Sequence, residues 1–150
     1  MNKITAAITA VGAYVPDYVL TNKILETLVD TNDEWITART GIKERRILKD
    51  DTKGTSFLAI KAAQDLIKKA NIDPLEIDLL LMATATADMP VASTGAYVAT
   101  EIGATNAFAY DLQSACSSFL FGMSTAAAYI ESGRYKKVLL IGADKMSSIV

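Results

Sequence analysis

The pattern of hydrophobic and polar residues along this chain predicts an alternation of strands and helices. Residues 78–86 and 137–143 each contain a continuous apolar run, which is typical of strands buried on both faces of a parallel sheet. Apolar segments at residues 3–11 and 107–112 predict two further strands. The charged residues 43–51 predict a loop or an edge strand.

Helices are predicted between these strands from their starting residues and from the period of their apolar positions. Thr21 can cap a short helix over residues 21–29, and Asn32 can cap a second helix that ends at Gly41. A third, amphipathic helix starts at Ser56. Its apolar stripe consists of Leu58, Ala62, Leu66 and Ala70.

Two more helices are expected at residues 94–102 and 116–132. The resulting order of elements predicts an α/β layered domain, and a chain of 150 residues is one domain or part of a larger one. Residues 115–130 are expected to form a central helix packed on all sides, because they are too few and too polar to span a membrane. No helix follows the strand at 137–143 to cover its second face, so we expect residues 1–150 to be C-terminally incomplete.

Composition and charge exclude several classes of function. The formal net charge is −2 and no basic block stands out, which argues against nucleic-acid binding. One cysteine and no histidine argue against the common zinc sites, and no phosphate-binding glycine loop is present. The N-terminus has no signal-peptide pattern, and an unpaired cysteine suits a reducing compartment, so we expect a cytoplasmic protein.

The single cysteine, Cys116, lies where the strand at 107–112 leads into the helix at 116–132. Free backbone N–H groups and the positive end of the helix dipole converge at such a junction and favour the thiolate, the nucleophilic form. A lone cysteine in a reducing compartment is otherwise most often a small buried hydrophobe. A catalytic nucleophile and a buried thiol therefore both remain open, and the chain offers no histidine as a base.

Three other features carry weaker signals. Trp35 and Arg39 are four residues apart on a predicted helix and could present an aromatic ring and a cation together, although a core tryptophan and a solvated arginine would give the same pattern. Met89 beside Pro90 marks an apolar loop tip that could be a contact surface. Asp111 is either a buried acid near Cys116 or a backbone anchor.

Taken together, residues 35–46 (WITARTGIKERR) and 111–119 (DLQSACSSF) resemble β-ketoacyl-acyl carrier protein synthase III, the condensing enzyme that starts bacterial type II fatty acid synthesis. Residues 80–85, the Met89-Pro90 pair and residues 138–144 are similar to that family as well. The resemblance covers the whole chain but only the N-terminal half of a family member. It implies a thiolase-like α/β fold with two similar halves, each a mixed five-stranded sheet with helices on both faces.

The resemblance also implies roles for individual residues. Cys116 would accept an acyl group, expected to be acetyl, from acyl-CoA, and the carbanion from decarboxylated malonyl-acyl carrier protein would then attack the thioester. Trp35 and Arg39 would bind the CoA adenine, and Thr31 would make a further nucleotide contact. Met89 would close the acyl pocket of a partner subunit in a homodimer. No cofactor or metal is implied, because the CoA thioester is a substrate.

The chain departs from the family pattern at two positions and lacks two further groups. Ser118 stands where the family usually has glycine, and Ser114 where it often has alanine, so either serine could narrow the space beside the thiolate. The family's histidine and asparagine, which promote decarboxylation, lie in the half that this chain lacks, so the 150 residues alone are expected to be inactive. Two alternatives remain: a related synthase of polyketide or quinolone type that uses another acyl-CoA, and a non-catalytic partner subunit.

Overall fold

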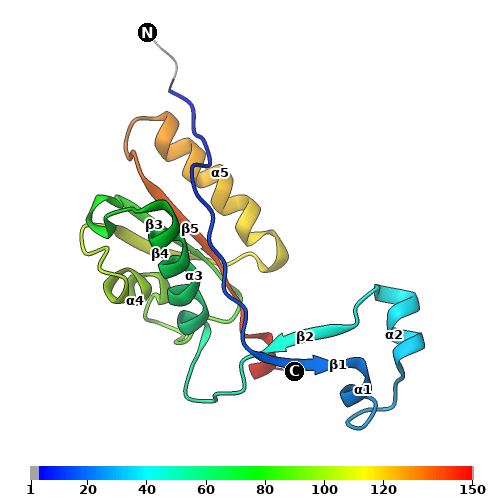
Figure 1. Cartoon of the computed structure of the whole chain (residues 1–150). Helices are drawn as coiled ribbons and strands as arrows, with labels where there is room; N and C mark the ends of the chain where they lie inside the picture. Colours follow the sequence, from blue (N-terminus) through cyan, green and yellow to red (C-terminus); the bar gives the residue numbers. More distant parts are fainter. Residues whose placement is uncertain (1–3, 150) are drawn as a thin grey trace. The chain divides into compact units, whose positions relative to one another are not determined.

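The structure is a computed structural model that describes residues 4–149. Their contacts form two compact units: a larger one of residues 4–14 and 53–146, and a smaller one of residues 15–52 and 147–149. The larger unit contains, in chain order, α3 (Thr55–Ala70), β3 (Leu79–Ala83), α4 (Thr94–Glu101), β4 (Phe108–Leu112), α5 (Ser118–Glu131) and β5 (Val138–Gly142) (Figure 1). The smaller unit contains β1 (Tyr18–Thr21), α1 (Asn22–Leu25), α2 (Asp33–Thr40) and β2 (Glu44–Ile47). Short 3-10 turns lie at Pro74–Glu76, Ala115–Ser117 and Met146–Ser148.

The larger unit is organised around a three-stranded parallel sheet in the order β4-β3-β5. The apolar run of β3 takes the central place, with Leu79 opposite Phe108 on one side and Val138 on the other. All five residues of β3 are buried, as the continuous run predicts for a strand covered on both faces. The predicted strands at 107–112 and 137–143 are confirmed as its two neighbours.

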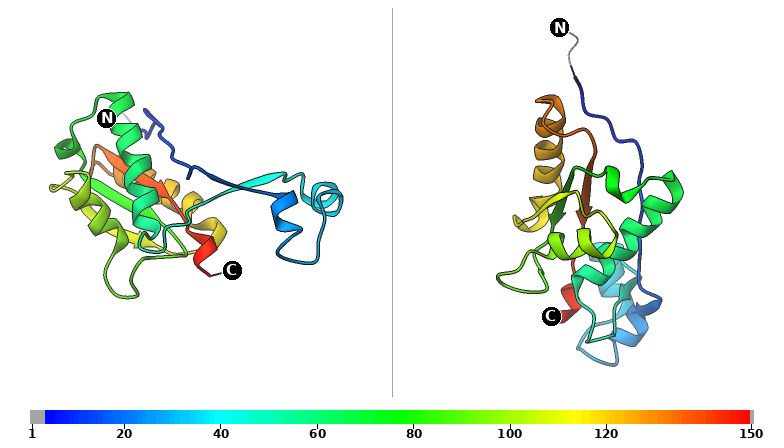
Figure 2. Two further views of the ribbon diagram at one scale, coloured as in Figure 1. Left: turned by 60° about the horizontal axis from the view of Figure 1, so that its bottom comes forward. Right: turned by 90° about the vertical axis from the view of Figure 1, so that its left-hand side faces the viewer.

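Helices cover both faces of this sheet (Figure 2, right). Gly95 of α4 lies against Leu80 and Met82, which share one face, and that face forms the core with α3. Gly122 of α5 lies against Leu140, on the opposite face. A Cβ atom at Gly122 would be 2.5 Å from Leu140 Cδ1, so a larger residue there would require the Leu140 side chain to move.

The amphipathic helix α3 begins at Thr55, one residue before the predicted start, and ends at Asn71 in the left-handed conformation (φ 50°). Its buried line passes through Ala59 and Ala63. The predicted stripe is therefore wrong by one position: Leu58, Ala62 and Leu66 are only half-buried, and Ala70 is exposed. Small side chains occupy the buried line because α3 packs closely against its neighbours.

The smaller unit is an antiparallel ribbon of β1 and β2 with two short helices. β2 confirms the edge-strand alternative for residues 43–51. Thr21 caps α1 as expected, but the helix ends at Leu25 and the prediction through residue 29 is wrong. Leu28 and Val29 are exposed, so continuing the helix would gain no packing, and short helices depend on packing.

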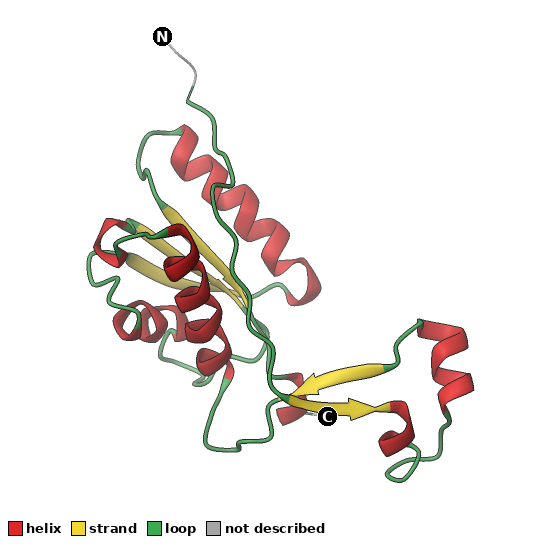
Figure 3. Cartoon of the chain, in the orientation of Figure 1, coloured by secondary structure: helices red, strands yellow, loops and turns green. Residues whose placement is uncertain are grey.

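The predicted strand at residues 3–11 is wrong over the residues that the structure describes; Lys3 lies outside them. Residues 4–14 form an extended segment without a pairing strand, drawn as loop in Figure 3. The segment lies along α3 instead: the Ala13 N–H donates to Asp65 Oδ2 (3.0 Å), and Gly12 packs against Leu66. Alternating apolar residues make a strand only where a second backbone supplies ladder hydrogen bonds.

Two further expectations need correction. Within residues 4–149, the five strands form a three-stranded and a two-stranded sheet, not one mixed five-stranded sheet, because β1 and β2 pair only with each other. The second correction concerns α5, which was expected to be packed on all sides. It is covered on one side only. Its exposed apolar side chains are Phe119, Leu120, Phe121 and Met123. Among the described residues, no helix is long and apolar enough to cross a membrane.

Candidate active site

The candidate nucleophile Cys116 lies in the 3-10 turn Ala115–Ser117, between the end of β4 and the start of α5 at Ser118. The predicted strand-to-helix junction is confirmed, although the α-helix starts two residues after the cysteine and not at it. The Cys116 thiol is exposed. The alternative of a structural, buried thiol is therefore wrong for the described chain, and a substrate can reach the sulfur.

The turn that carries Cys116 is tight. Ala115 adopts the left-handed conformation (φ 46°), which is rare for a residue with a Cβ atom. The Ser114 N–H donates a 2.6 Å hydrogen bond to Ser118 Oγ, and the Ser117 N–H donates to the Ser114 carbonyl at 3.0 Å. These two bonds close the turn around the cysteine. Sequence reasoning treated Ser118 only as a source of crowding and missed this contact.

Asp111, the last polar residue of β4, anchors the start of α4. Its Oδ1 accepts hydrogen bonds from Ser93 Oγ (2.9 Å) and the Gly95 N–H (2.7 Å), and its Oδ2 accepts one from the Thr94 N–H (2.8 Å). A carboxylate that binds free N–H groups at a helix N-terminus is a stabilising arrangement. The backbone-anchor interpretation is therefore confirmed. The same carboxylate fixes the strand end that leads into the Cys116 turn.

A second aspartate anchors the neighbouring strands. Asp144 follows β5 and its Oδ1 accepts hydrogen bonds from the Ala85 N–H (2.7 Å), Thr84 Oγ1 (3.0 Å) and Thr86 Oγ1 (3.2 Å). Thr84, Ala85 and Thr86 directly follow β3. Because parallel strands end at one edge of a sheet, this edge carries the loops after β3, β4 and β5, and in open α/β sheets ligands bind at that edge.

The loop that follows β3 at this edge carries Met89. Met89 and Val91 are both exposed, and the loop reaches α4 without forming a helix or strand. The prediction of an apolar loop tip is confirmed. The Cys116 turn and the Met89 loop thus both leave the carboxyl edge of the three-stranded sheet.

In the smaller unit, Trp35 and Arg39 lie together on α2. The Arg39 guanidinium carbon is 4.4 Å from the centre of the Trp35 ring, within the range of a cation–π contact. Trp35 is 51% exposed, so the core interpretation of this residue is wrong; Ile36 supplies the buried contact of α2. Thr31 lies half-buried just before the N-cap residue Asn32.

The ends of α2 follow the predicted capping. Asn32 Oδ1 accepts from the Trp35 N–H at 2.8 Å, and Gly41 takes the left-handed conformation (φ 71°) that ends the helix. The first helical turn, with Trp35 in it, is therefore fixed by a side-chain cap.

A buried asparagine, Asn22, holds the base of α2 in place. Its amide nitrogen donates to Asp33 Oδ1 (2.7 Å) and to the Ile42 carbonyl (2.8 Å), and its amide oxygen accepts from Arg45 (2.6 Å). The hydrogen bond from Asn22 holds the pKa of Asp33 below its usual value. Arg45 is thus bound to a buried side chain and is not a freely solvated charge. No local sequence signal identifies Asn22, because its partners lie 11 to 23 residues away.

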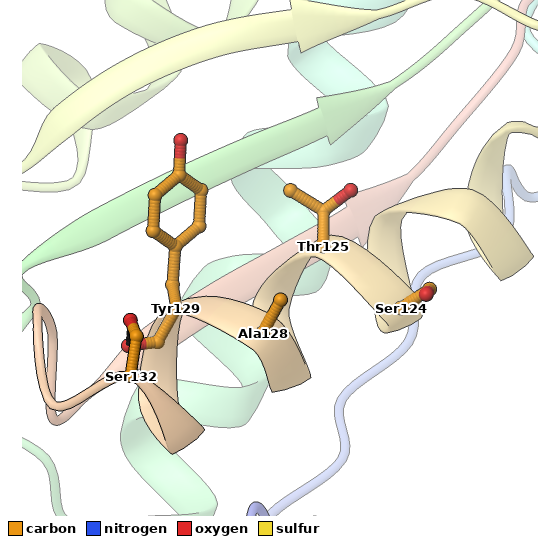
Figure 4. Close-up of a pocket in the computed structure, with 5 residues that line it drawn as sticks. All are labelled: Ser124, Thr125, Ala128, Tyr129 and Ser132. Carbon is orange, nitrogen blue, oxygen red and sulfur yellow. Dashed lines mark hydrogen bonds between the residues drawn. The ribbon is translucent and has the colours of Figure 1, made fainter.

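A shallow groove of about 450 Å³ runs along α5. Figure 4 shows its lining side chains, Ser124, Thr125, Ala128, Tyr129 and Ser132. A neighbouring hydroxyl, that of Tyr110 on β4, has its pKa raised to about 12 by burial and by its hydrogen bond with Tyr129. None of the residues predicted as functional lines this groove.

The chain is similar to solved structures of β-ketoacyl synthases. A crystal structure of 3-oxoacyl-[acyl-carrier-protein] synthase III from Aquifex aeolicus matches 93% of this chain, and 44% of its own, with a TM-score of 0.89 and 44% identity. The priming β-ketosynthase of a polyketide biosynthetic pathway matches 94% of this chain, and 42% of its own, with a TM-score of 0.89 and 34% identity. The α/β fold with an exposed cysteine after β4 thus has the architecture of the thiolase-like condensing enzymes.

The sequence comparisons narrow the class. β-Ketoacyl-[acyl-carrier-protein] synthase III 2 of Bacteroides thetaiotaomicron is 54% identical over all 150 residues, and synthase III of Porphyromonas gingivalis is 55% identical over 148. The family model of 3-oxoacyl-[acyl-carrier-protein (ACP)] synthase III matches residues 110–150. The chain spans 45% and 44% of the length of these two relatives. Over its whole length, the chain is similar in sequence and in fold to members of the β-ketoacyl-[acyl-carrier-protein] synthase III family.

Proposed function

We propose that this chain is the N-terminal half of a β-ketoacyl-acyl carrier protein synthase III and that it supplies the acyl-accepting cysteine. The observation that carries the proposal is the exposed Cys116 in the closed turn after β4, within the segment that the family model matches. The complete enzyme transfers acetyl from acetyl-CoA to Cys116 and condenses it with malonyl-acyl carrier protein. This reaction starts fatty acid synthesis.

The chemistry follows from a thiolate at this turn. The Cys116 sulfur attacks the thioester carbonyl of acetyl-CoA, the carbon–sulfur bond to CoA breaks, and the CoA thiolate leaves and takes up a proton. Malonyl-acyl carrier protein then loses carbon dioxide, and its carbanion attacks the acetyl carbonyl and expels the Cys116 thiolate. The product is a 3-oxoacyl chain on the carrier protein. Both steps are group transfers without oxidation or reduction, so the proposal includes no cofactor.

The remaining predicted site residues have binding roles in this proposal. The exposed Trp35 ring and the Arg39 guanidinium beside it offer a flat surface and a cation to the adenine and phosphates of CoA, with Thr31 as a further contact. Met89 contributes to the acyl pocket of the partner subunit in a homodimer. We place this enzyme in the cytoplasm, since an unpaired cysteine suits a reducing compartment.

Mass spectrometry tests the acylation step directly. The complete protein, incubated with acetyl-CoA, gains the mass of one acetyl group, and peptide mapping locates it on Cys116. Cys116→Ala gains nothing under the same conditions. Ser124→Ala, which removes a hydroxyl from the α5 groove and leaves the cysteine turn intact, is the matched control and is acetylated like the wild type. If no acyl-CoA tried leaves an acyl adduct on the protein, the result would favour the non-catalytic partner subunit.

A second candidate, a synthase that primes polyketide or quinolone formation, is favoured by the structural likeness to the polyketide priming ketosynthase. Both candidates form an acyl-Cys116 adduct, so acylation does not separate them. The second substrate separates the two candidates. A β-ketoacyl-acyl carrier protein synthase III uses malonyl-acyl carrier protein, whereas rapid turnover with malonyl-CoA supports the second candidate.

A further inference from the structure

The turn around Cys116 contains one conformation that must be held in place. Ala115 has φ 46°, and the left-handed region is unfavourable for a residue with a Cβ atom. Such conformations persist only where surrounding contacts hold them. The cysteine follows Ala115 directly, so the conformation of Ala115 sets the direction in which the Cys116 side chain leaves the backbone.

The side chain that spans this turn is Ser118. It is only 3% exposed, and its Oγ accepts the 2.6 Å hydrogen bond from the Ser114 N–H, so it connects the residue before the turn to the first residue of α5. Ser114, with φ −152° and ψ 38°, supplies no side-chain cap to the turn. The adjacent Ser117 is exposed and supplies no side-chain cap to α5.

The geometry points to Ser118 as a positioning residue: its buried hydroxyl, through the Ser114 N–H, holds Ala115 in the left-handed conformation and so keeps Cys116 directed for acylation. This assignment rests on the proposed function. Ser118 touches neither substrate nor the reacting atoms in this role. It acts through the backbone of the turn that leads into α5.

The test measures two reactions of Cys116 in the complete protein: acetylation by acetyl-CoA and alkylation by iodoacetamide, each followed by peptide mass spectrometry. In Ser118→Ala, the acetylation rate at saturating acetyl-CoA falls roughly threefold to tenfold, the range that one hydrogen bond accounts for. The half-saturating concentration and the final extent of acetylation stay unchanged. The rate at which iodoacetamide alkylates Cys116 in Ser118→Ala falls as well. Ser117→Ala, which removes an exposed hydroxyl of the same turn, alkylates like the wild type.

A second variant ties the effect to the conformation of Ala115. Glycine adopts positive φ without cost, so the double variant Ala115→Gly/Ser118→Ala no longer needs the hydroxyl and recovers most of the wild-type rate. If Ser118→Ala does not fold alone, a folded and reactive double variant supports the assignment. If Ser118→Ala shows a lower final extent of acetylation but an unchanged acetylation rate, Ser118 has a merely structural role and the assignment is overturned.

Two other results would also overturn it: an alkylation rate in Ser118→Ala equal to that of the wild type, or a double variant no faster than Ser118→Ala. The proposed function can fail separately. If acetyl-CoA acetylates none of these proteins, the acyltransferase proposal fails, while the alkylation rates still decide the role of Ser118.

Discussion

The two candidate-site regions are built in different ways. The Cys116 turn is closed by hydrogen bonds between residues at most four positions apart, and it contains one unfavourable backbone conformation. Helix α2, which carries Trp35 and Arg39, is capped at both ends and held at its base by the long-range contacts of Asn22. The proposed nucleophile is therefore directed by local backbone geometry, whereas the proposed CoA-binding residues are held by a side-chain network.

This comparison predicts that the smaller unit depends on Asn22 more than on any single apolar residue of α2. Asn22→Ala leaves Asp33, Arg45 and the Ile42 carbonyl without their partner and lowers the free energy of unfolding by about 2–3 kcal/mol. Urea unfolding and limited proteolysis across residues 15–52 measure the loss.

Asn106→Ala is the control for Asn22→Ala. Asn106 donates to the Leu75 carbonyl (3.1 Å) at an exposed position, so its removal is expected to change the free energy of unfolding by less than about 1 kcal/mol. Equal effects of the two substitutions would show that the side-chain network does not hold α2.

The proposed CoA-binding surface, formed by Trp35 and Arg39 on α2, can be altered without unfolding the chain. Arg39→Ala removes the cation over the Trp35 ring, and we expect CoA affinity to fall about tenfold, since the cation–π contact and the proposed phosphate contact are lost together. Isothermal titration with CoA measures the change, and the melting temperature is expected to stay within a few degrees. Arg134→Ala, which removes another arginine beside an aromatic ring, Tyr135, is the control and leaves CoA affinity unchanged.

The smallest expected effect concerns pH. Hydrogen bonding from Asn22 lowers the pKa of Asp33 in the folded chain from its usual 3.8. The contribution of Asp33 to stability is thus fully present above pH 3.8 and is lost as the pH falls through the lower, folded value. Comparing Asp33→Asn with the wild type in urea between pH 7 and pH 2.5 isolates this contribution. An identical acid profile for both proteins would contradict it.

Different parts of the molecule were predictable from the sequence to different degrees. The apolar run at Leu79–Ala83 predicted the central strand, and Asn32 with Gly41 predicted both ends of α2, because these signals are local. The strand predicted at residues 3–11 is wrong over its described residues, since pairing depends on a partner that the pattern does not specify.

In the candidate site, too, features with a local sequence signal were predicted and other features were missed. The junction that carries Cys116 follows from the order of the elements, and the exposed Met89 follows from a local turn pattern. The bond from Ser114 to Ser118 depends on the φ angle of Ala115, which no residue type encodes. Asn22 was missed for a different reason, because its contacts join residues that are distant in the sequence.

The central position of β3 has a consequence for the synthesis of the protein. β3 leaves the ribosome before either of its partners, and its ladder is complete only when β5, starting at Val138, has emerged. Until β4 has emerged this strand of five apolar residues has no neighbour, and until β5 has emerged one of its two sides stays unpaired. Parallel pairing between distant segments is slow and leaves such strands open to aggregation. Leu79–Ala83 is thus a segment of the nascent chain that stays open to aggregation until both of its neighbouring strands have emerged.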